Sequence, residues 1–362
     1  MFEKENALWV ASTEGIIESV QQLLMEEGID LNWADEENQR TSFYRACGNG
    51  HLEVVKLLLN DKRVDVNKSA SDGATPFYSA CGNGRSDVVK LLISEEKVDV
   101  KTAKNNGTTP FYIACQQGNH EVVQLLLNDS RIDVNGNNNT GFTPLAIASH
   151  QGHLETVRLL SNDPRVEVNK ENKVDGSTPF YIACKQGHIG IVQILVENQF
   201  VDVNKADKNL GLTPFQIACI GGNVNLVKTL LRSEKLDINK AMHDDITPFF
   251  SACAQGQIEI IKLLLNDHRI DLNRRQHKSE TPFSVACFTG QIEVIKLLLN
   301  DERLDVNQAN SSIGLTPFAI ACQEGHIKIV LLFLENKRGN FSFLPKKKIF
   351  FKAYRRSEKN NK

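Results

Sequence analysis

The sequence lacks any long apolar stretch. No segment of its 362 residues approaches the roughly 18 consecutive apolar residues that a membrane-spanning helix requires, so no such helix is predicted. Residues 1–6 (MFEKEN) have neither the basic start nor the apolar run of a secretory signal. We therefore expect an intracellular, cytoplasmic protein.

Motifs of catalysis are also missing. The sequence contains no Gly-x-Ser-x-Gly nucleophile elbow, no glycine-rich phosphate-binding loop and no protein-kinase signature. Paired acids such as Glu95 and Glu96 fall on expected surface turns, without an apolar pocket that would shift a carboxyl pKa. The sequence therefore predicts that the protein is not an enzyme and has no catalytic residues and no cofactor.

What the sequence does contain is a Thr-Pro pair that recurs every 34 or 35 residues. The copies are Thr75-Pro76, Thr109-Pro110, Thr143-Pro144, Thr178-Pro179, Thr213-Pro214, Thr247-Pro248, Thr281-Pro282 and Thr316-Pro317. A degenerate copy, Thr41-Ser42, precedes them, and residues 11–15 keep the rest of the pattern. A fixed period of this length indicates about ten tandem structural repeats.

Each repeat predicts two helices. Threonine caps the first helix by accepting hydrogen bonds from its free amides, and proline fits the first helical position, where no amide is needed. A glycine such as Gly118 then ends this helix in a left-handed turn. In the next segment Leu52, Val55 and Leu58 fall on one face at helical spacing. A short extended piece and a polar turn lead to the next threonine.

This pattern resembles the ankyrin repeat, whose signature has Thr-Pro, then Ala, Gly and a Leu-Leu pair at a period near 33. The resemblance covers roughly residues 5–340 and implies an all-α solenoid of helix-turn-helix repeats with short β-hairpin fingers. The family's finger glycine is replaced by Gln39, Asp245 and Ser279. We expect those three tips to be less regular, because a side chain disfavours positive φ.

We expect one repeat domain over residues 1–340, with the first unit (about residues 1–35) as an N-terminal cap, and a basic extension over residues 341–362. Total net charge is −2, yet residues 337–362 hold ten Lys or Arg and one Glu. The final segment is therefore +9 and the preceding residues carry −11.

The eight cysteines all occupy one repeat position, just after the alanine of the first helix. Packed helices lie about 8–10 Å apart, too far for a disulfide, which needs Cα atoms within about 7 Å. No Cys-x-x-Cys pair exists, so we expect small buried apolar side chains rather than a metal site. His150 and His153 share a repeat but lack a further ligand, and no metal site is predicted there.

Binding is therefore the expected function, through the groove that the fingertips and first helices form in ankyrin proteins. The residues before each threonine and after each cysteine are expected to face this groove, and large apolar ones are typical of contact sites. The expected anchors are Phe142, Leu212, Ile220, Ile246, Phe288 and Leu315, and the expected polar contacts are Asn106, Gln116, Gln117 and Gln255. The alternative is that fingers pack sideways and bury the apolar groups.

Two further groups have competing interpretations. Tyr44, Tyr78, Tyr112 and Tyr181 fit either a ligand-binding aromatic row or, as we favour, packing between helices. The basic residues of the extension fit a helix cap, a nuclear import signal, or a contact to nucleic acid or an anionic membrane. These residues are Lys346, Lys347, Lys348, Lys352, Arg355 and Arg356.

The sequence thus predicts a monomeric, non-catalytic scaffold or adaptor that binds a protein of unknown identity. The alternative function is that of a regulatory protein which contacts nucleic acid or an anionic membrane through the basic extension.

Overall fold

The structure is a computed structural model that describes residues 3–276, 279–312, 314–336 and 338. The described residues form 20 α-helices, which confirms the predicted all-α class. Contacts divide the chain into two compact units, the N-terminal unit (residues 1–201) and the C-terminal unit (residues 202–362).

The helices of the N-terminal unit are α1 (Glu3–Glu14), α2 (Ile17–Leu24), α3 (Ser42–Asn49), α4 (Leu52–Asn60), α5 (Pro76–Gly82), α6 (Ser86–Ile93), α7 (Pro110–Gln117), α8 (His120–Leu127), α9 (Pro144–Gln151), α10 (Leu154–Asn162), α11 (Pro179–Gln186) and α12 (Ile189–Glu197). Those of the C-terminal unit are α13 (Pro214–Ile220), α14 (Val224–Leu231), α15 (Pro248–Gln255), α16 (Ile258–Leu265), α17 (Pro282–Phe288), α18 (Ile292–Leu298), α19 (Pro317–Glu324) and α20 (Ile327–Glu335).

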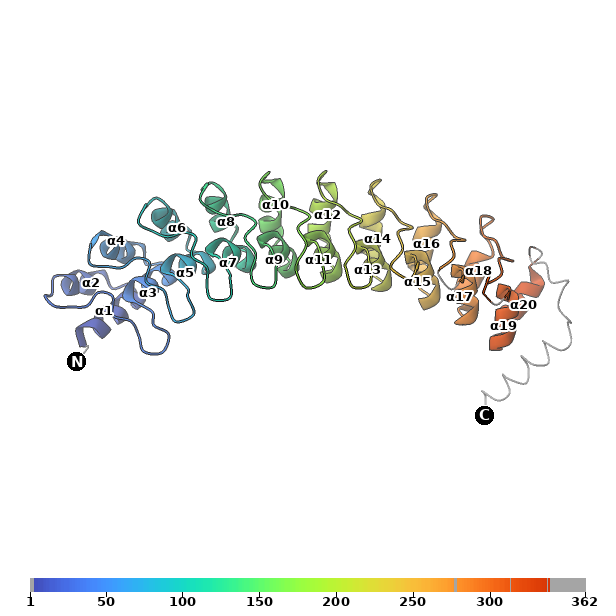
Figure 1. Cartoon of the computed structure of the whole chain (residues 1–362), viewed down its shortest axis with the longest axis horizontal. Coiled ribbons are helices and arrows are strands. Elements are labelled where there is room, and N and C mark those ends of the chain that lie inside the picture. The colour runs from blue at the N-terminus through green and yellow to red at the C-terminus, as the bar shows by residue number, and fades with distance from the viewer. Residues whose placement is uncertain (1–2, 277–278, 313, 337, 339–362) are drawn as a thin grey trace, which may run out of the picture. The chain divides into compact units, whose positions relative to one another are not determined.

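Each unit is a stack of helix pairs. In the N-terminal unit the odd-numbered first helices pack on one another in one row, and the even-numbered second helices form a second row (Figure 1). The C-terminal unit repeats this arrangement with α13 to α20. Loops between successive pairs project beside the first helices, and we call them finger loops.

The first helices begin and end as their capping residues predict. The Thr109 Oγ1 accepts a hydrogen bond from the Tyr112 amide, Pro110 occupies the first turn, and Gly118 ends α7 at φ 72°. The same threonine cap opens α3, α5, α9, α11, α13, α15, α17 and α19. These signals act within a few residues, which explains why they are readable from sequence.

The core lies between the two helix rows. It is built from the apolar residue, usually phenylalanine, at the second position of the first helices and from the apolar stripe of each second helix. Among its fully buried side chains are Phe43, Phe77, Phe111, Phe180, Phe215, Phe249 and Phe283. All eight cysteines are free and buried beside them, which confirms their predicted role as small core residues. Because each pair packs only on its neighbours, stability accumulates along the stack.

The predicted β-hairpins are not shown as β structure in the finger loops. The residues that the structure describes contain no strand, and their one isolated bridge pairs Ala34 with Thr41. A typical finger is closed by two backbone hydrogen bonds, such as Lys104 N to Thr108 O at 2.9 Å and Gly107 N to Lys104 O at 2.8 Å. A bond from Asn105 N to Asp72 O joins it to the preceding finger. One bond between neighbouring fingers is too short a ladder to make a strand.

Gln39, Asp245 and Ser279 all adopt positive φ, at 56°, 59° and 65°. The expected irregularity is wrong for the last two, whose loops keep the usual closing bond: Met242 N donates to Ile246 O, and Gln276 N to Glu280 O. The loop therefore imposes the left-handed conformation on residues that disfavour it, at a cost of about 1 kcal/mol each.

An Asp-x-Arg pair joins neighbouring repeats at the outer end of the second helices. In the N-terminal unit, Arg131 donates to the Asp129 carboxylate and also to the carbonyl of Ile93, at the end of α6, both at 2.6 Å. The bond from Arg131 lowers the pKa of Asp129, which keeps the carboxylate charged. We call this arrangement an arginine clasp. The described residues contain five, formed by Arg63, Arg131, Arg165, Arg269 and Arg303.

An asparagine in the extended piece after the second helix adds another link between repeats, both in repeats with a clasp and in repeats without one. The Asn67 side chain donates to the carbonyl of Lys97 and accepts from the amide of Asp99, both at 2.8 Å. The same pair of bonds recurs at Asn32, Asn135, Asn204, Asn239 and Asn273. These side chains satisfy the backbone of the extended pieces that were expected between repeats.

Replacing Arg131 by alanine is expected to lower the free energy of unfolding of the N-terminal unit by about 1 kcal/mol, since it removes charge-assisted bonds that are partly screened by solvent. Urea unfolding followed by circular dichroism measures the change. The matched control is Arg158→Ala, which breaks an ion pair to Glu155 in which both side chains are more than half exposed. Equal losses in the two variants would show that the clasp is no more stabilising than an ordinary surface pair.

Candidate binding surfaces

In each unit the first helices and the finger loops form a surface along which the same repeat positions recur. We call this surface the first-helix face. In eight of the first helices a cysteine is buried at one position, and the residue that follows it ranges from buried, as at Gly48, to exposed, as at Phe288. The identity of that next residue therefore decides whether the face is hollow, polar or apolar at each repeat.

In the N-terminal unit the face is hollow where this residue is glycine. A Cβ added to Gly48 of α3 would meet the Ser79 Oγ of α5 at 2.4 Å, and one on Gly82 would meet Ile113 of α7 at 3.0 Å. The next first helix therefore packs closely against each glycine, and both glycines also line a cavity of about 430 Å³ over α3, α5 and α7.

Basic and aromatic side chains line this cavity, which we call the basic pocket. Arg40, Arg45 and Lys104 contribute cationic groups, and Tyr44 and Tyr78 contribute ring surface. The Arg40 guanidinium lies 5.5 Å from the Tyr44 ring centre, and the Lys104 ammonium 5.9 Å from that of Tyr78. The pocket therefore combines positive charge with rigid aromatic walls, an arrangement suited to an acidic partner group.

Only part of this positive charge is neutralised within the described residues. Lys104 pairs with Asp72 at 2.8 Å, and this bond raises the pKa of Lys104, which stays protonated. The Nε of Arg40 is shielded from solvent without a hydrogen-bond partner in the described part of the chain. Arg45 donates to the Thr13 hydroxyl and lies 4.9 Å from the Trp9 ring centre.

The sequence interpretation missed the basic pocket. The cationic side chains of this pocket come from three different repeats, and the sequence alone does not show that they converge. Successive glycines after the cysteines, at Gly48 and Gly82, were the signal that could have located it.

The polar residues that were expected as contacts in the N-terminal unit differ in their exposure and in their hydrogen bonds. Gln117 is exposed and lines the basic pocket, and Gln116 is half-buried with its carbonyl accepting from His153. Asn106 is exposed, but its side chain already accepts from the Thr108 amide and hydroxyl within its own finger. Asn106 therefore shapes the fingertip.

Phe142 is half-buried in the N-terminal unit. Its ring meets that of His150 edge-on, with centroids 6.3 Å apart. The remaining anchors belong to the C-terminal unit.

In the C-terminal unit the expected anchors divide into two groups. Ile220 and Phe288, which follow fully buried cysteines, are 38% and 54% exposed. Leu212, Ile246 and Leu315, which precede threonines, are half-buried, and their carbonyls close the finger loops. Gln255 is exposed on α15 and its Oε1 accepts from Gln257. Leu212, Ile246 and Leu315 thus fit the alternative in which fingers pack sideways and bury apolar groups. Ile220 and Phe288 are exposed.

Several exposed apolar residues were not expected as contacts. Val174 and Leu210 lie on finger loops with exposures of 69% and 52%, and Phe200, after α12, is 70% exposed.

The tyrosines confirm the expectation of packing between helices. Tyr44, Tyr78, Tyr112 and Tyr181 are all less than 10% exposed. The Tyr78 hydroxyl contacts the Thr108 hydroxyl at 3.1 Å, and Asn138 donates to the Tyr112 hydroxyl at 3.1 Å. Burial raises the pKa of Tyr112 to about 12.

The histidines after the inter-helix glycines serve the same packing role. The Nε2 atoms of His51, His153 and His188 lie 2.8–3.1 Å from carbonyls of the preceding repeat. His326 does the same in the C-terminal unit, at 3.0 Å from the Phe288 carbonyl. Within the described ranges no three His, Cys, Asp or Glu side chains are grouped to hold a metal ion.

The basic residues of the expected extension, from Lys346 to Arg356, lie outside the described residues. Among the helices that are described, none has the length and apolarity to cross a membrane.

Comparison with known proteins agrees with this geometry. The family described as ankyrin repeats (3 copies) matches the chain at residues 8–103, 94–172, 164–242, 199–276 and 249–342. A search of curated proteins gives no match. Among solved structures, the crystal structure of the human ASB11 ankyrin repeat domain is similar, with a TM-score of 0.53 and 22% sequence identity over 63% of this chain and 97% of that one. At this identity the similarity concerns the fold alone. Because the family matches together span nearly all of the described residues, the chain belongs to the ankyrin-repeat family.

Proposed function

We propose that this protein is a non-catalytic scaffold or adaptor that binds a protein partner through its first-helix face. The observation that carries the proposal is the exposure of Ile220 and Phe288, each of which follows a cysteine that is 0% exposed. Large apolar side chains held in water on a rigid helix are costly unless a partner covers them, and such side chains dominate binding hot spots.

The half-buried residues beside them complete the proposed surface. Leu212, Ile246 and Leu315 supply apolar flanks within the C-terminal unit, and Gln255 supplies an adaptable polar contact. In the N-terminal unit Phe142, Gln116 and Gln117 are proposed contacts of the same kind, with the basic pocket favouring an acidic segment of the partner. Helix caps and packed fingers preform this face, so little binding energy is lost in ordering it.

The test compares two matched double variants of the full chain. The first, Ile220→Asp with Phe288→Asp, places charge on the first-helix face. The control, Leu154→Asp with Leu334→Asp, places it on second helices at residues of similar exposure, 37% and 51%. A partner captured from lysate by the wild type is then purified, and its Kd for each variant is measured by calorimetry.

Affinity for the partner is expected to fall at least about 30-fold in the first variant, because two hot-spot contacts are replaced by unpaired charges. It is expected to stay within about threefold in the control. Circular dichroism checks that both variants fold. Equal losses in both, or loss only in a chain that ends at Arg338, would reject the first-helix face and favour the basic extension and its nucleic-acid or membrane contact.

A further inference from the structure

The basic pocket holds more positive than negative charge. Its lining residues include three cations, Arg40, Arg45 and Lys104, and no carboxylate. Lys104 is paired with Asp72, a carboxylate that also acts on Arg40 at longer range. Among the described residues neither arginine forms an ion pair of its own. Three cations set against one carboxylate therefore leave positive charge that no described acid neutralises.

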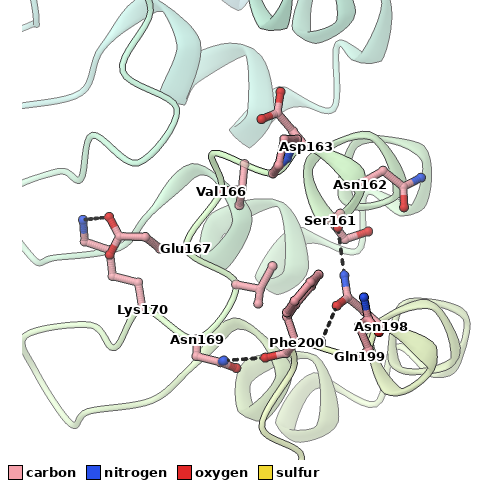
Figure 2. A pocket seen from close by; sticks show the side chains of 12 residues that line it. Ser161, Asn162, Asp163, Val166, Glu167, Asn169, Lys170, Asn198, Gln199 and Phe200 are labelled. Carbon is pink, nitrogen blue, oxygen red and sulfur yellow. Dashed lines mark hydrogen bonds and ion pairs between the residues drawn. The ribbon is translucent and has the colours of Figure 1, made fainter.

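Another cavity of the N-terminal unit shows the contrast. About 850 Å³ of space lies beside Phe200, and two acids line it. Arg165 pairs with Asp163 at 2.7 Å. Lys170 pairs with Glu167 at 3.2 Å, as Figure 2 shows. Since both acids are neutralised within the chain, that cavity offers a ligand no unpaired charge, whereas the basic pocket does.

Neutral contacts hold Arg45 in place. Its Nε donates to the Thr13 hydroxyl at 3.3 Å, and its guanidinium lies over the Trp9 ring. The terminal nitrogens of this guanidinium form no hydrogen bond within the described part of the chain. They remain available as a pair of donors to an oxyanion.

Arg40 is still less engaged. Its Nε is shielded from solvent without a partner among the described residues, and its guanidinium carbon lies 5.5 Å from the Tyr44 ring centre. Asp35, on the same finger, does not neutralise it, because the Asp35 carboxylate accepts from the backbone amides of Asn38 and Arg40. An anion can therefore bind this guanidinium without first breaking an ion pair.

Two uncharged donors lie in the same pocket. They are the Ser79 hydroxyl of α5 and the Gln117 amide of α7. Neither side chain forms a hydrogen bond to another described residue. The pocket thus gathers charged and neutral donors from neighbouring repeats around one space.

This donor set suits a phosphate better than a carboxylate. A phosphomonoester carries about −1.5 to −2 charges at pH 7 and three strong acceptor oxygens, whereas a carboxylate carries a single charge and two oxygens. The planar fork of a guanidinium matches two phosphate oxygens at once. A cavity of about 430 Å³ also has room for the side chain that bears the phosphate, between the Tyr44 and Tyr78 rings.

We propose that the basic pocket binds a phosphorylated serine or threonine side chain of the partner protein. Arg40 and Arg45 bind the phosphate oxygens, and Ser79 and Gln117 complete the hydrogen bonds. This inference rests on the proposed function in that the partner is a protein which docks on the first-helix face. The pocket lies in the N-terminal unit and the exposed anchors Ile220 and Phe288 in the C-terminal unit, so each proposal can fail without the other.

The experiment uses the full chain with ¹⁵N in its tryptophans, of which there are two. The Trp9 indole donates to the Arg40 carbonyl at 2.9 Å and its ring lies beside Arg45, so its indole signal reports on the pocket. Trp33 does not line the pocket and serves as the internal reference. The variant Trp9→Phe assigns the two signals.

Three peptides are titrated in phosphate-free buffer: acetyl-Gly-Gly-phosphoserine-Gly-Gly-amide and its serine and glutamate analogues. We expect a saturable shift of the Trp9 signal with the phosphopeptide, an affinity at least about fivefold lower for the glutamate peptide, and no saturable shift with the serine peptide. Inorganic phosphate should shift the same signal with at most the affinity of the phosphopeptide. Tighter binding of inorganic phosphate would assign the pocket to the free ion and overturn the proposal.

Two variants that each remove one positive charge complete the test. Arg40→Gln should weaken phosphopeptide binding about tenfold, since it removes a charged donor from the pocket. Lys90→Gln removes the same charge at an exposed α6 position outside the pocket, and should change binding less than about twofold. Circular dichroism checks that both fold. Equal binding of the phosphoserine and serine peptides, or undiminished binding to Arg40→Gln, would overturn the proposal and leave the test with Ile220 and Phe288 untouched.

Discussion

Replacing Phe283 by alanine is expected to lower the free energy of unfolding of the C-terminal unit by about 3–5 kcal/mol, the loss typical of a buried aromatic. Phe283 is 0% exposed, and its ring meets that of Phe333 in α20 edge-on at 5.6 Å. The truncation removes the ring from a contact between two repeats, and the short helix α17 has little freedom to collapse into the space.

The control for Phe283 lies on the same helix. Phe288→Ala makes an identical change five residues later, at a ring that is 54% exposed. Its expected effect on unfolding is within about 0.5 kcal/mol, because little apolar area returns to water. Guanidinium unfolding of both variants measures the difference. A similar loss for both would mean that Phe288 is packed in solution, and would remove the basis for its proposed contact role.

The second large effect is a loss of stability in mild alkali. Burial raises the pKa of every cysteine thiol above its ordinary value of 9.0, to about 11 for Cys322 and further for the others. Each compact unit contains four of these thiols.

The sign of the pH dependence follows from the raised pKa. Below pH 9 the thiols are protonated in both folded and unfolded chains, and their stabilising contribution is fully present. Above pH 9 the unfolded chain loses thiol protons that the folded chain keeps, so the free energy of unfolding falls until the folded pKa is reached. At pH 10 the expected loss is about 1.4 kcal/mol per thiol, or roughly 5–6 kcal/mol for each unit.

Urea unfolding in reducing buffer between pH 8 and pH 10 tests this expectation. The range stops at the ordinary pKa of tyrosine, 10.0, to keep buried hydroxyls such as that of Tyr112 from contributing strongly. In the variant Cys81→Ala with Cys115→Ala, the alkaline loss of the N-terminal unit should be about half that of the wild type. Identical pH profiles would assign the loss to groups other than the thiols.

A feature of the fold was predictable from the sequence where residues close together in the chain determine it. Thr109, Pro110 and Gly118 fix the ends of α7 through contacts within a few residues, so periodicity and capping gave the repeat, its helices and the buried cysteines. The β-hairpin expectation failed because a strand needs a ladder of bonds between loops, and each finger makes only one.

The binding surfaces were predictable only in part, because they also depend on contacts between residues that are far apart in the sequence. Ile220 and Phe288 are exposed, as expected for residues that face the groove. The sequence left open whether the loops bury Leu212 and Ile246, because the half-burial of these residues depends on how the fingers fold.

By itself the sequence thus determined the period, the helix pairs, the capping and the identity of the core positions, all of which follow from hydrogen bonds and apolar spacing along the chain. Only the tertiary structure showed which side chains form hydrogen bonds between neighbouring repeats and which repeats lack the arginine clasp. Arg131 reaches a carbonyl 38 residues earlier, whereas in the repeat of α11 and α12 the shorter side chain of Asn198 makes the equivalent contact to Ser161. The basic pocket likewise exists because Arg40, Arg45 and Lys104, from separate repeats, converge over two glycines. Such features depend on distances between repeats, which packing sets and sequence spacing does not.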